Sequence, residues 1–182
     1  APLIDNPAAA SVPLPDFFDL PGLIARHARE RPQALATVCG DDRLDYAALD
    51  DAMDRVAASL QRDGCKPGDT IAICALASNA YIVLFMGALR AGLAVAPLAP
   101  SSTPAQIAGM TADAGARHLF LDAANAMAVP ADLTGPGVQR IRLDDTGGMR
   151  GGDNAGDTPL SAWLAPAGSR PHPVAIQPRW PF

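Results

Sequence analysis

The stretch from Thr70 to Pro100 constrains most strongly how this chain can fold. It reads TIAICALASNAYIVLFMGALRAGLAVAPLAP, in which two short apolar runs, 70–75 and 93–98, flank a longer apolar segment. Short apolar runs of this kind are typical of strands buried on both faces, and Ser78 or Asn79 can cap a helix between them. A strand, a crossover helix and a second strand of this length form a right-handed parallel unit. The stretch therefore predicts an α/β protein with a parallel sheet.

Within the predicted helix between these two strands, residues 79–91, the stretch 81–89 is apolar on nearly every side. A helix with this pattern is expected to be enclosed by the rest of the fold, with Leu84 near its centre. Gly92 can adopt the left-handed conformation that ends such a helix. His118–Leu121 is another short apolar run. It predicts a third parallel strand beside the first two.

Two further segments carry clear helix signals. After Asp45, apolar residues recur at steps of three and four, which predicts an amphipathic helix capped by Asp45. Its acidic residues, Asp50, Asp51 and Asp54, favour a solvated helix face over a metal site, because the helix dipole stabilises carboxylates near its N-terminus. Thr103-Pro104-Ala105-Gln106 reads as a capping box that starts another helix.

The remaining segments set the expected domain organisation. Residues 1–16 hold four prolines and predict an extended arm, and residues 17–143 form the α/β unit. Within that unit, 138–143 alternates apolar and polar residues, as a half-exposed strand does. Residues 144–157 are rich in Gly and Asp and predict a flexible loop. Residues 158–182 predict a short helix through Trp163, followed by a proline-rich stretch.

Charge and cysteine content exclude several classes of protein. The net charge is −5 and no basic stripe is visible, which argues against general nucleic-acid binding. No apolar run reaches the roughly 18–20 residues of a membrane span. The three cysteines, Cys39, Cys65 and Cys74, are odd in number and far apart, so neither a zinc site nor a disulfide framework is expected. Free thiols indicate a reducing compartment, and a cytoplasmic location is expected.

Four stretches, taken in order, resemble the N-terminal part of the adenylate-forming superfamily of acyl- and aryl-CoA synthetases. Leu44-Asp45-Tyr46-Ala47-Ala48-Leu49 resembles the first family motif, with aspartate and alanine in place of its threonine and glutamate. Gly64–Asp69 resembles the turn before the first core strand. The stretch from Gly87 through Pro100 resembles the second motif, and Pro104–Leu121 resembles the helix and strand after it. The resemblance implies a layered, flavodoxin-like α/β subdomain.

The resemblance also implies a reaction. Family enzymes join a carboxylic acid to ATP as an acyl-adenylate, with Mg²⁺, and then form a thioester with CoA. They bind ATP through a Ser/Thr/Gly-rich loop ending in lysine, expected just after Phe182. The implied protein is thus an N-terminal fragment of an AMP-forming acid–thiol ligase, inactive by itself, and no catalytic residue carries over. Some relatives place a CoA-binding arginine where this chain has Ser101, so Ser101 and Ser102 are the candidate CoA contacts.

Two other interpretations stay open. One is a fragment of a peptide-synthetase adenylation domain, although residues 94–100 lack the tyrosine and aspartate more often seen there. The other is a non-enzymatic, flavodoxin-like binding domain. No metal ligand and no bound cofactor are expected for the isolated chain. Self-association is expected if apolar surface stays uncovered.

Overall fold

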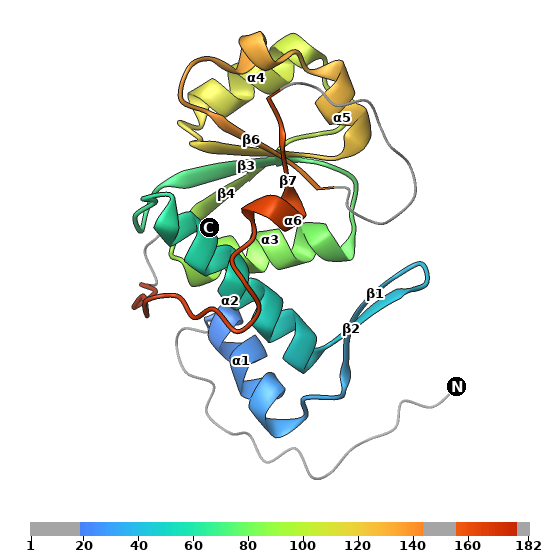
Figure 1. Cartoon of the computed structure of the whole chain (residues 1–182), viewed down its shortest axis with the longest axis vertical. Coiled ribbons are helices and arrows are strands. Elements are labelled where there is room, and N and C mark those ends of the chain that lie inside the picture. The colour runs from blue at the N-terminus through green and yellow to red at the C-terminus, as the bar shows by residue number, and fades with distance from the viewer. Residues whose placement is uncertain (1–18, 144–155, 178–182) are drawn as a thin grey trace, which may run out of the picture.

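The structure is a computed structural model that describes residues 19–143 and 156–177. Its centre is a parallel β-sheet with helices on both sides, which makes three layers (Figure 1). Helices α4 and α5 cover one face, and α2 and α3 lie on the other side, with α1 against them. The predicted layered, flavodoxin-like fold class is confirmed. The predicted arm at 1–16 lies outside the described residues, as does nearly all of the predicted flexible loop.

The elements follow the chain in an order typical of α/β proteins. The helices are α1 (Leu20–Glu30), α2 (Tyr46–Arg62), α3 (Asn79–Arg90), α4 (Pro104–Asp113), α5 (Ala123–Ala128), the 3₁₀ helix η1 (Ala131–Thr134) and α6 (Leu160–Trp163). The strands are β1 (Leu35–Cys39), β2 (Asp42–Asp45), β3 (Thr70–Cys74), β4 (Ala94–Pro97), β5 (His118–Leu121), β6 (Gln139–Arg142) and β7 (Thr158–Pro159).

The central sheet has the strand order β4-β3-β5-β6-β7, and every pair in it is parallel. Strand β3 pairs with β4 on one side and with β5 on the other. The three segments predicted as parallel neighbours are therefore confirmed. Strands β1 and β2 form a separate antiparallel hairpin that projects from the layers (Figure 1).

Alternate residues of each sheet strand supply two separate cores. In β3, Ile71 and Ile73 face the core shared with α2 and α3. Ala72 and Cys74 face the smaller core, to which α4 contributes Ile107. All four β3 side chains are completely buried. This two-sided burial is why the strand reads as a continuous apolar run rather than an alternating one.

Helix ends follow the sequence signals closely. The Ser78 hydroxyl accepts a hydrogen bond from the Tyr81 amide at 3.1 Å, so Ser78 is the cap of α3. Thr103 and Gln106 form the reciprocal capping box at the start of α4. Asp45 caps α2 by accepting from the Ala48 amide at 2.8 Å. Gly92 has φ 77°, the left-handed conformation that a side chain would strain.

Strand β6 differs from its prediction. The expectation of a half-exposed strand at 138–143 is wrong, because β6 lies between β5 and β7 and Arg140 is only 4% exposed. The Arg140 guanidinium bonds the Asp157 carboxylate, with Nε and Oδ1 2.6 Å apart, and donates to the Val129 carbonyl. Asp157 falls at the end of the predicted loop, and its side chain is 1% exposed. Thr158 and Pro159 pair with β6 before α6 begins.

The segment after α6 lies along α2, as the red trace in Figure 1 shows. Side chains of α2 bind its main chain. The Ser59 hydroxyl accepts from the Ala165 amide at 2.8 Å, and Arg55 donates to the Ala165 carbonyl at 2.7 Å. Further along, the Gln61 side-chain amide bonds both the carbonyl and the amide of His172. No helix or strand forms between 164 and 177, in agreement with its proline content.

Gly87 is where α2 and α3 come closest. A Cβ atom at this position would lie 2.6 Å from the Cβ and Cγ1 atoms of Val56 and 3.1 Å from the Met53 carbonyl oxygen. Gly87→Ala is therefore expected to lower the free energy of unfolding by about 1–3 kcal/mol, since the helices must move apart. Gly109 in α4 has no atom within 4 Å of the same position. Gly109→Ala is expected to raise stability by up to about 1 kcal/mol through helix propensity.

Urea unfolding of the two variants measures this contrast. The substitution is the same and both positions are helical, so propensity alone gives both variants the same sign. Opposite signs are expected because only Gly87 is at a helix contact. Equal stabilisation of both variants would show that α2 and α3 are not packed as closely as described.

Candidate functional site at the carboxyl edge of the sheet

The strand order creates one position where connections diverge. From β3 the chain crosses to β4 on one side, and it then returns to β5 on the other side of β3. The loops that leave β3 and β5 at their carboxyl ends therefore run in opposite directions. In open α/β sheets, the crevice at such a topological switch point is where ligands bind.

A pocket of about 520 Å³ lies at this position. The β3–α3 loop forms one wall, with Leu76, Ser78 and Asn79. Asp122, which follows β5, lies on another wall. The β1–β2 hairpin contributes Cys39. The pocket is mainly apolar, because alanines 75, 77, 80, 123 and 124 and Leu143 supply most of the remaining surface.

Most of the polar groups in the pocket are already engaged. The Asp122 carboxylate accepts from the Leu76 amide at 3.0 Å and from the Asn125 amide at 2.9 Å. It thus ties the β3–α3 loop to α5. The Cys39 thiol lies 3.7 Å from the Ala77 carbonyl oxygen, which holds the hairpin against the same loop. These contacts fix the shape of the pocket across three separate segments of sequence.

The Asn79 side-chain amide is not engaged in this way. Asn79 is 6% exposed, and its Nδ2 atom is buried with no hydrogen-bond partner in the part of the chain that the structure describes. The sequence offered Asn79 and Ser78 as alternative caps, and the structure uses Ser78. Sequence reasoning missed both Asn79 and Asp122 as pocket residues. The available signal was their position just beyond the carboxyl ends of two parallel strands.

Ser101 and Ser102 lie on the same edge of the sheet but outside this pocket. They are in the turn between β4 and α4, where the Ser102 amide donates to the Ala99 carbonyl at 3.0 Å. Ser101 is exposed and Ser102 is half-buried. The pocket residues come from the other side of β3. The structure therefore does not bring the two candidate serines together with Asn79 and Asp122.

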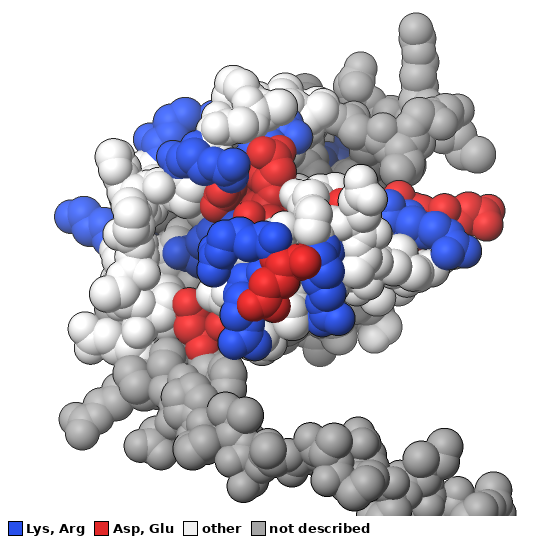
Figure 2. All heavy atoms as spheres, turned by 90° about the horizontal axis from the view of Figure 1, so that it is seen from below, with Lys and Arg blue, Asp and Glu red and all other residues white. Residues whose placement is uncertain are grey.

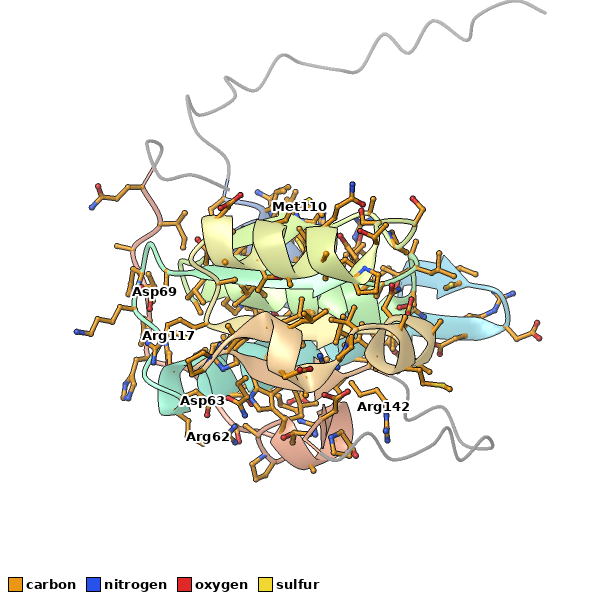
Figure 3. The ribbon with its side chains drawn as sticks, turned by 90° about the horizontal axis from the view of Figure 1, so that it is seen from above. Arg62, Asp63, Asp69, Met110, Arg117 and Arg142 are labelled. Atoms are coloured by element: carbon orange, nitrogen blue, oxygen red, sulfur yellow. The ribbon has the colours of Figure 1, made fainter. Side chains whose placement is uncertain are left out.

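The opposite, amino edge of the sheet holds a buried network. Asp63 Oδ2 accepts from the Trp163 indole at 2.6 Å and lies 3.0 Å from His118 Nε2. Cys65 Sγ is 3.6 Å from His118 Nδ1. Figure 3 shows Asp63, together with Arg62, Asp69 and Arg117, at the end of the molecule away from the β1–β2 hairpin.

The thiol, imidazole and carboxylate of this network follow one another as they do in a nucleophilic triad. Their protonation states do not suit nucleophilic catalysis. Burial raises the pKa of the Cys65 thiol to about 11, so the nucleophilic thiolate is scarce at neutral pH. Burial acts to raise the pKa of Asp63 as well. Hydrogen bonds from Trp163, His118 and Arg62 outweigh it, and the pKa lies below its usual value. The network joins α6 to the α2–β3 turn, so the role of His118 in it is structural.

Two members of the acid cluster on α2, Asp50 and Asp54, are also structural, and the prediction that they are solvated is wrong. Asp54 is 8% exposed and accepts from Arg90 at 2.7 Å. The same arginine bonds Asp50 at 2.5 Å, and Arg170 pairs with Asp54 from the far end of the chain. Burial with full pairing is how a protein tolerates such charges. On the face seen in Figure 2, acidic and basic side chains are interspersed.

Other kinds of site are absent from the described residues. Between 19 and 143 and between 156 and 177, no three His, Cys, Asp or Glu side chains form a metal-binding group. None of the helices described is long and apolar enough to cross a membrane. Over the same residues, Cys39, Cys65 and Cys74 are free thiols, as predicted.

Comparison with known proteins identifies the family. The AMP-binding enzyme family matches residues 24–177, which is most of the chain. The protein therefore belongs to the AMP-binding, adenylate-forming enzymes. It is 31% identical over 109 residues to the isonitrile lipopeptide synthase of Mycobacterium tuberculosis, covering 60% of this chain and 4% of that protein. It is 33% identical over 138 residues to the nonribosomal peptide synthetase ecdA of Aspergillus rugulosus, covering 75% of this chain and 2% of that protein.

Solved structures share the fold. The benzoate CoA ligase of Burkholderia xenovorans LB400 matches with a TM-score of 0.69 and 24% identity, over 85% of this chain and 30% of that one. The N-terminal subdomain of Klebsiella oxytoca NpsA matches with a TM-score of 0.58 and 21% identity, over 68% and 30%. The anthranilate CoA ligase AuaEII matches with a TM-score of 0.73 and 14% identity, over 88% and 31%. The chain thus spans about a third of these structures and only a few per cent of the two synthetases.

Proposed function

We propose that this chain forms the N-terminal α/β subdomain of an AMP-forming acid–thiol ligase. The complete enzyme would activate a fatty or aromatic carboxylic acid with ATP and Mg²⁺ and transfer the acyl group to CoA. Membership of the adenylate-forming family supports the activation step. CoA is proposed as the acyl acceptor because of the sequence of residues 94–100, AVAPLAP. This sequence lacks the tyrosine and aspartate more often seen in peptide synthetases.

A peptide-synthetase adenylation domain is the second candidate. Sequence identity of 31% to the lipopeptide synthase and of 33% to the nonribosomal peptide synthetase favours it. The two candidate functions differ in the carboxylic acid that is activated and in the thiol that receives the acyl group. The polypeptide encoded by the complete gene separates them in an assay of AMP release. The ligase proposal expects AMP release that requires both CoA and a fatty or aromatic acid. Pyrophosphate exchange that depends on an amino acid and proceeds without CoA would overturn the proposal.

The described residues of the switch-point pocket do not fit a nucleoside triphosphate. Among the residues that the structure describes, the pocket at the switch point is lined by Asp42 and Asp122 and by no arginine, lysine or histidine. The only lysine in the sequence, Lys66, precedes β3 at the amino edge of the sheet. Binding of ATP and Mg²⁺ is therefore assigned to other segments of the proposed enzyme. Ser101 and Ser102 stay the proposed CoA contacts, through their hydroxyl groups.

The isolated chain is expected to form no acyl-adenylate. Stabilising charge on the α-phosphate requires preorganised cations and N–H donors, and the pocket supplies carboxylates instead. Pyrophosphate exchange with ATP, Mg²⁺ and a panel of fatty and aromatic acids measures this directly. We expect no exchange above a protein-free blank. Acid-dependent exchange by this chain would contradict the proposal that other segments supply the phosphate site.

The isolated chain is also proposed to self-associate. Leu76 is 72% exposed and Met127 64% exposed, and Val38 on the hairpin is 51% exposed. Exposed apolar side chains of this size promote association. Light scattering during size-exclusion chromatography should give the mass of a dimer or larger species. A monomer at high concentration would contradict this expectation.

A further inference from the structure

The side chain of Asn79, a residue that lines the switch-point pocket, holds an unused hydrogen-bond donor. Its Nδ2 atom is buried and has no acceptor among the residues described, although Asn79 itself lines the pocket. A buried amide left without a partner is destabilising. The last torsion of an asparagine side chain is soft, so the amide can turn towards an acceptor that enters the pocket.

The start of α3 adds to this donor. The amides of Asn79 and Ala80, at the first two helical positions, have no acceptor within the helix. The next two amides are engaged, because Tyr81 donates to the Ser78 hydroxyl and Ile82 to the Ser78 carbonyl. The N-terminus of a twelve-residue helix carries partial positive charge. This end of the pocket therefore favours a group rich in electron density.

The charged residues of the pocket restrict what that group can be. Asp42 on the hairpin and Asp122 after β5 both line the pocket, and the lining residues within 19–143 and 156–177 include no cationic side chain. Two carboxylates repel an anion such as a phosphate or a second carboxylate. Most of the wall is apolar, from alanines together with Leu76 and Leu143. The ligand must then be uncharged, with an acceptor oxygen at one end and a compact apolar body.

We propose that this pocket binds uncharged small molecules that carry a carbonyl or carboxamide oxygen on a compact apolar group, with Asn79 as the donor. The carbonyl oxygen lies at the start of α3, and the apolar group lies against the alanines that follow β3 and β5. This inference rests on the pocket alone and is independent of the proposed ligase reaction, which requires segments outside this chain.

Benzamide and benzoate test the proposal as a matched pair, since they share one shape and differ in charge. Titration of the isotopically labelled chain by two-dimensional NMR is expected to show benzamide shifts confined to 76–80 and 122–124. Benzoate is expected to bind at least about fivefold more weakly, because of the two carboxylates. Equal or tighter binding of benzoate would overturn the proposal, as would an absence of benzamide binding at the pocket.

Two variants and a control locate the contact. Asn79→Ala removes an unpaired donor, so the chain should stay folded while benzamide binding weakens about five- to tenfold. Ala80→Leu fills the pocket, keeps Asn79 and should weaken binding at least as much. Gln106→Ala, on the same edge of the sheet but outside the pocket, should bind benzamide as the parent does. Unchanged binding in Asn79→Ala, or equal loss in the Gln106 control, would refute the assignment.

Discussion

Arg140→Leu is expected to lower the free energy of unfolding by about 3–5 kcal/mol, the cost of leaving a buried charge unpaired. The Arg140 side chain is 4% exposed and the side chain of its partner Asp157 is 1% exposed. The two are joined by a pair of hydrogen bonds, from Nε to Oδ1 at 2.6 Å and from Nη2 to Oδ2 at 3.2 Å. Arg140 also donates to the carbonyls of Val129 and Ala126. One substitution therefore removes the partner of a carboxylate and of two main-chain acceptors.

Chemical denaturation of three further variants separates charge burial from general damage to the strand. The double variant Arg140→Leu/Asp157→Leu has no orphaned charge and should regain a large part of the loss. Arg117, 48% exposed, pairs with Asp69 at 3.4 Å, and Arg117→Leu should cost about 1 kcal/mol or less. If the double variant had the same free energy of unfolding as Arg140→Leu, the loss in that variant would not come from an unpaired Asp157 charge. Asp157→Leu alone completes the cycle.

The sheet and its crossover could be predicted from sequence because their signals are local. Strand β3 is buried on both faces and reads as an apolar run, and Ser78 and Gly92 mark the ends of α3 within that same stretch. The capping box at Thr103 is complete within four residues. Each of these features depends on neighbours in the chain, so no knowledge of the tertiary structure is needed to recognise it.

The ion pairs could not be predicted, because their partners are distant in sequence. Arg90 meets Asp54 across 36 positions, and Arg170 meets the same carboxylate across 116. On a helical wheel, a buried aspartate with a distant arginine looks the same as a solvated one. The alternating pattern of β6 misled for a related reason. Arg140 reads as a solvent-facing residue until Asp157 is placed beside it.

The candidate site depends both on features encoded by local sequence and on contacts between residues distant in sequence. The sequence predicts that β3, β4 and β5 are parallel neighbours, but the strand order that places a switch point between β3 and β5 comes from the structure. The polar character of the site also comes from the structure, because Ser78 and Asn79 are equally good caps in sequence, and only the structure shows Asn79 left without a partner among the residues it describes. The hairpin residue Cys39 joins the pocket through a contact across 38 positions, which no local pattern encodes.

Leu84→Ala is expected to cost about 2–5 kcal/mol of unfolding free energy. Leu84 is completely buried at the middle of α3, in the core that also contains Ile71 and Ile73 of β3. Alanine at this position leaves a cavity between the helix and the sheet, because close-packed neighbours relax only in part. Ile82 on the same helix is half-buried, so Ile82→Ala should cost less.

Leu76 supplies the matched control for this prediction. It is 72% exposed in the loop before α3, and Leu76→Ala should change stability by no more than about 0.5 kcal/mol. Urea midpoints for the three leucine and isoleucine variants should therefore fall in the order of burial, with Leu84 lowest and Leu76 closest to the parent. A Leu84→Ala midpoint equal to that of the parent would contradict the enclosed position of α3. Because α3 also carries Asn79 at its start, a helix that is not fixed in this way could not hold the proposed donor at the pocket wall.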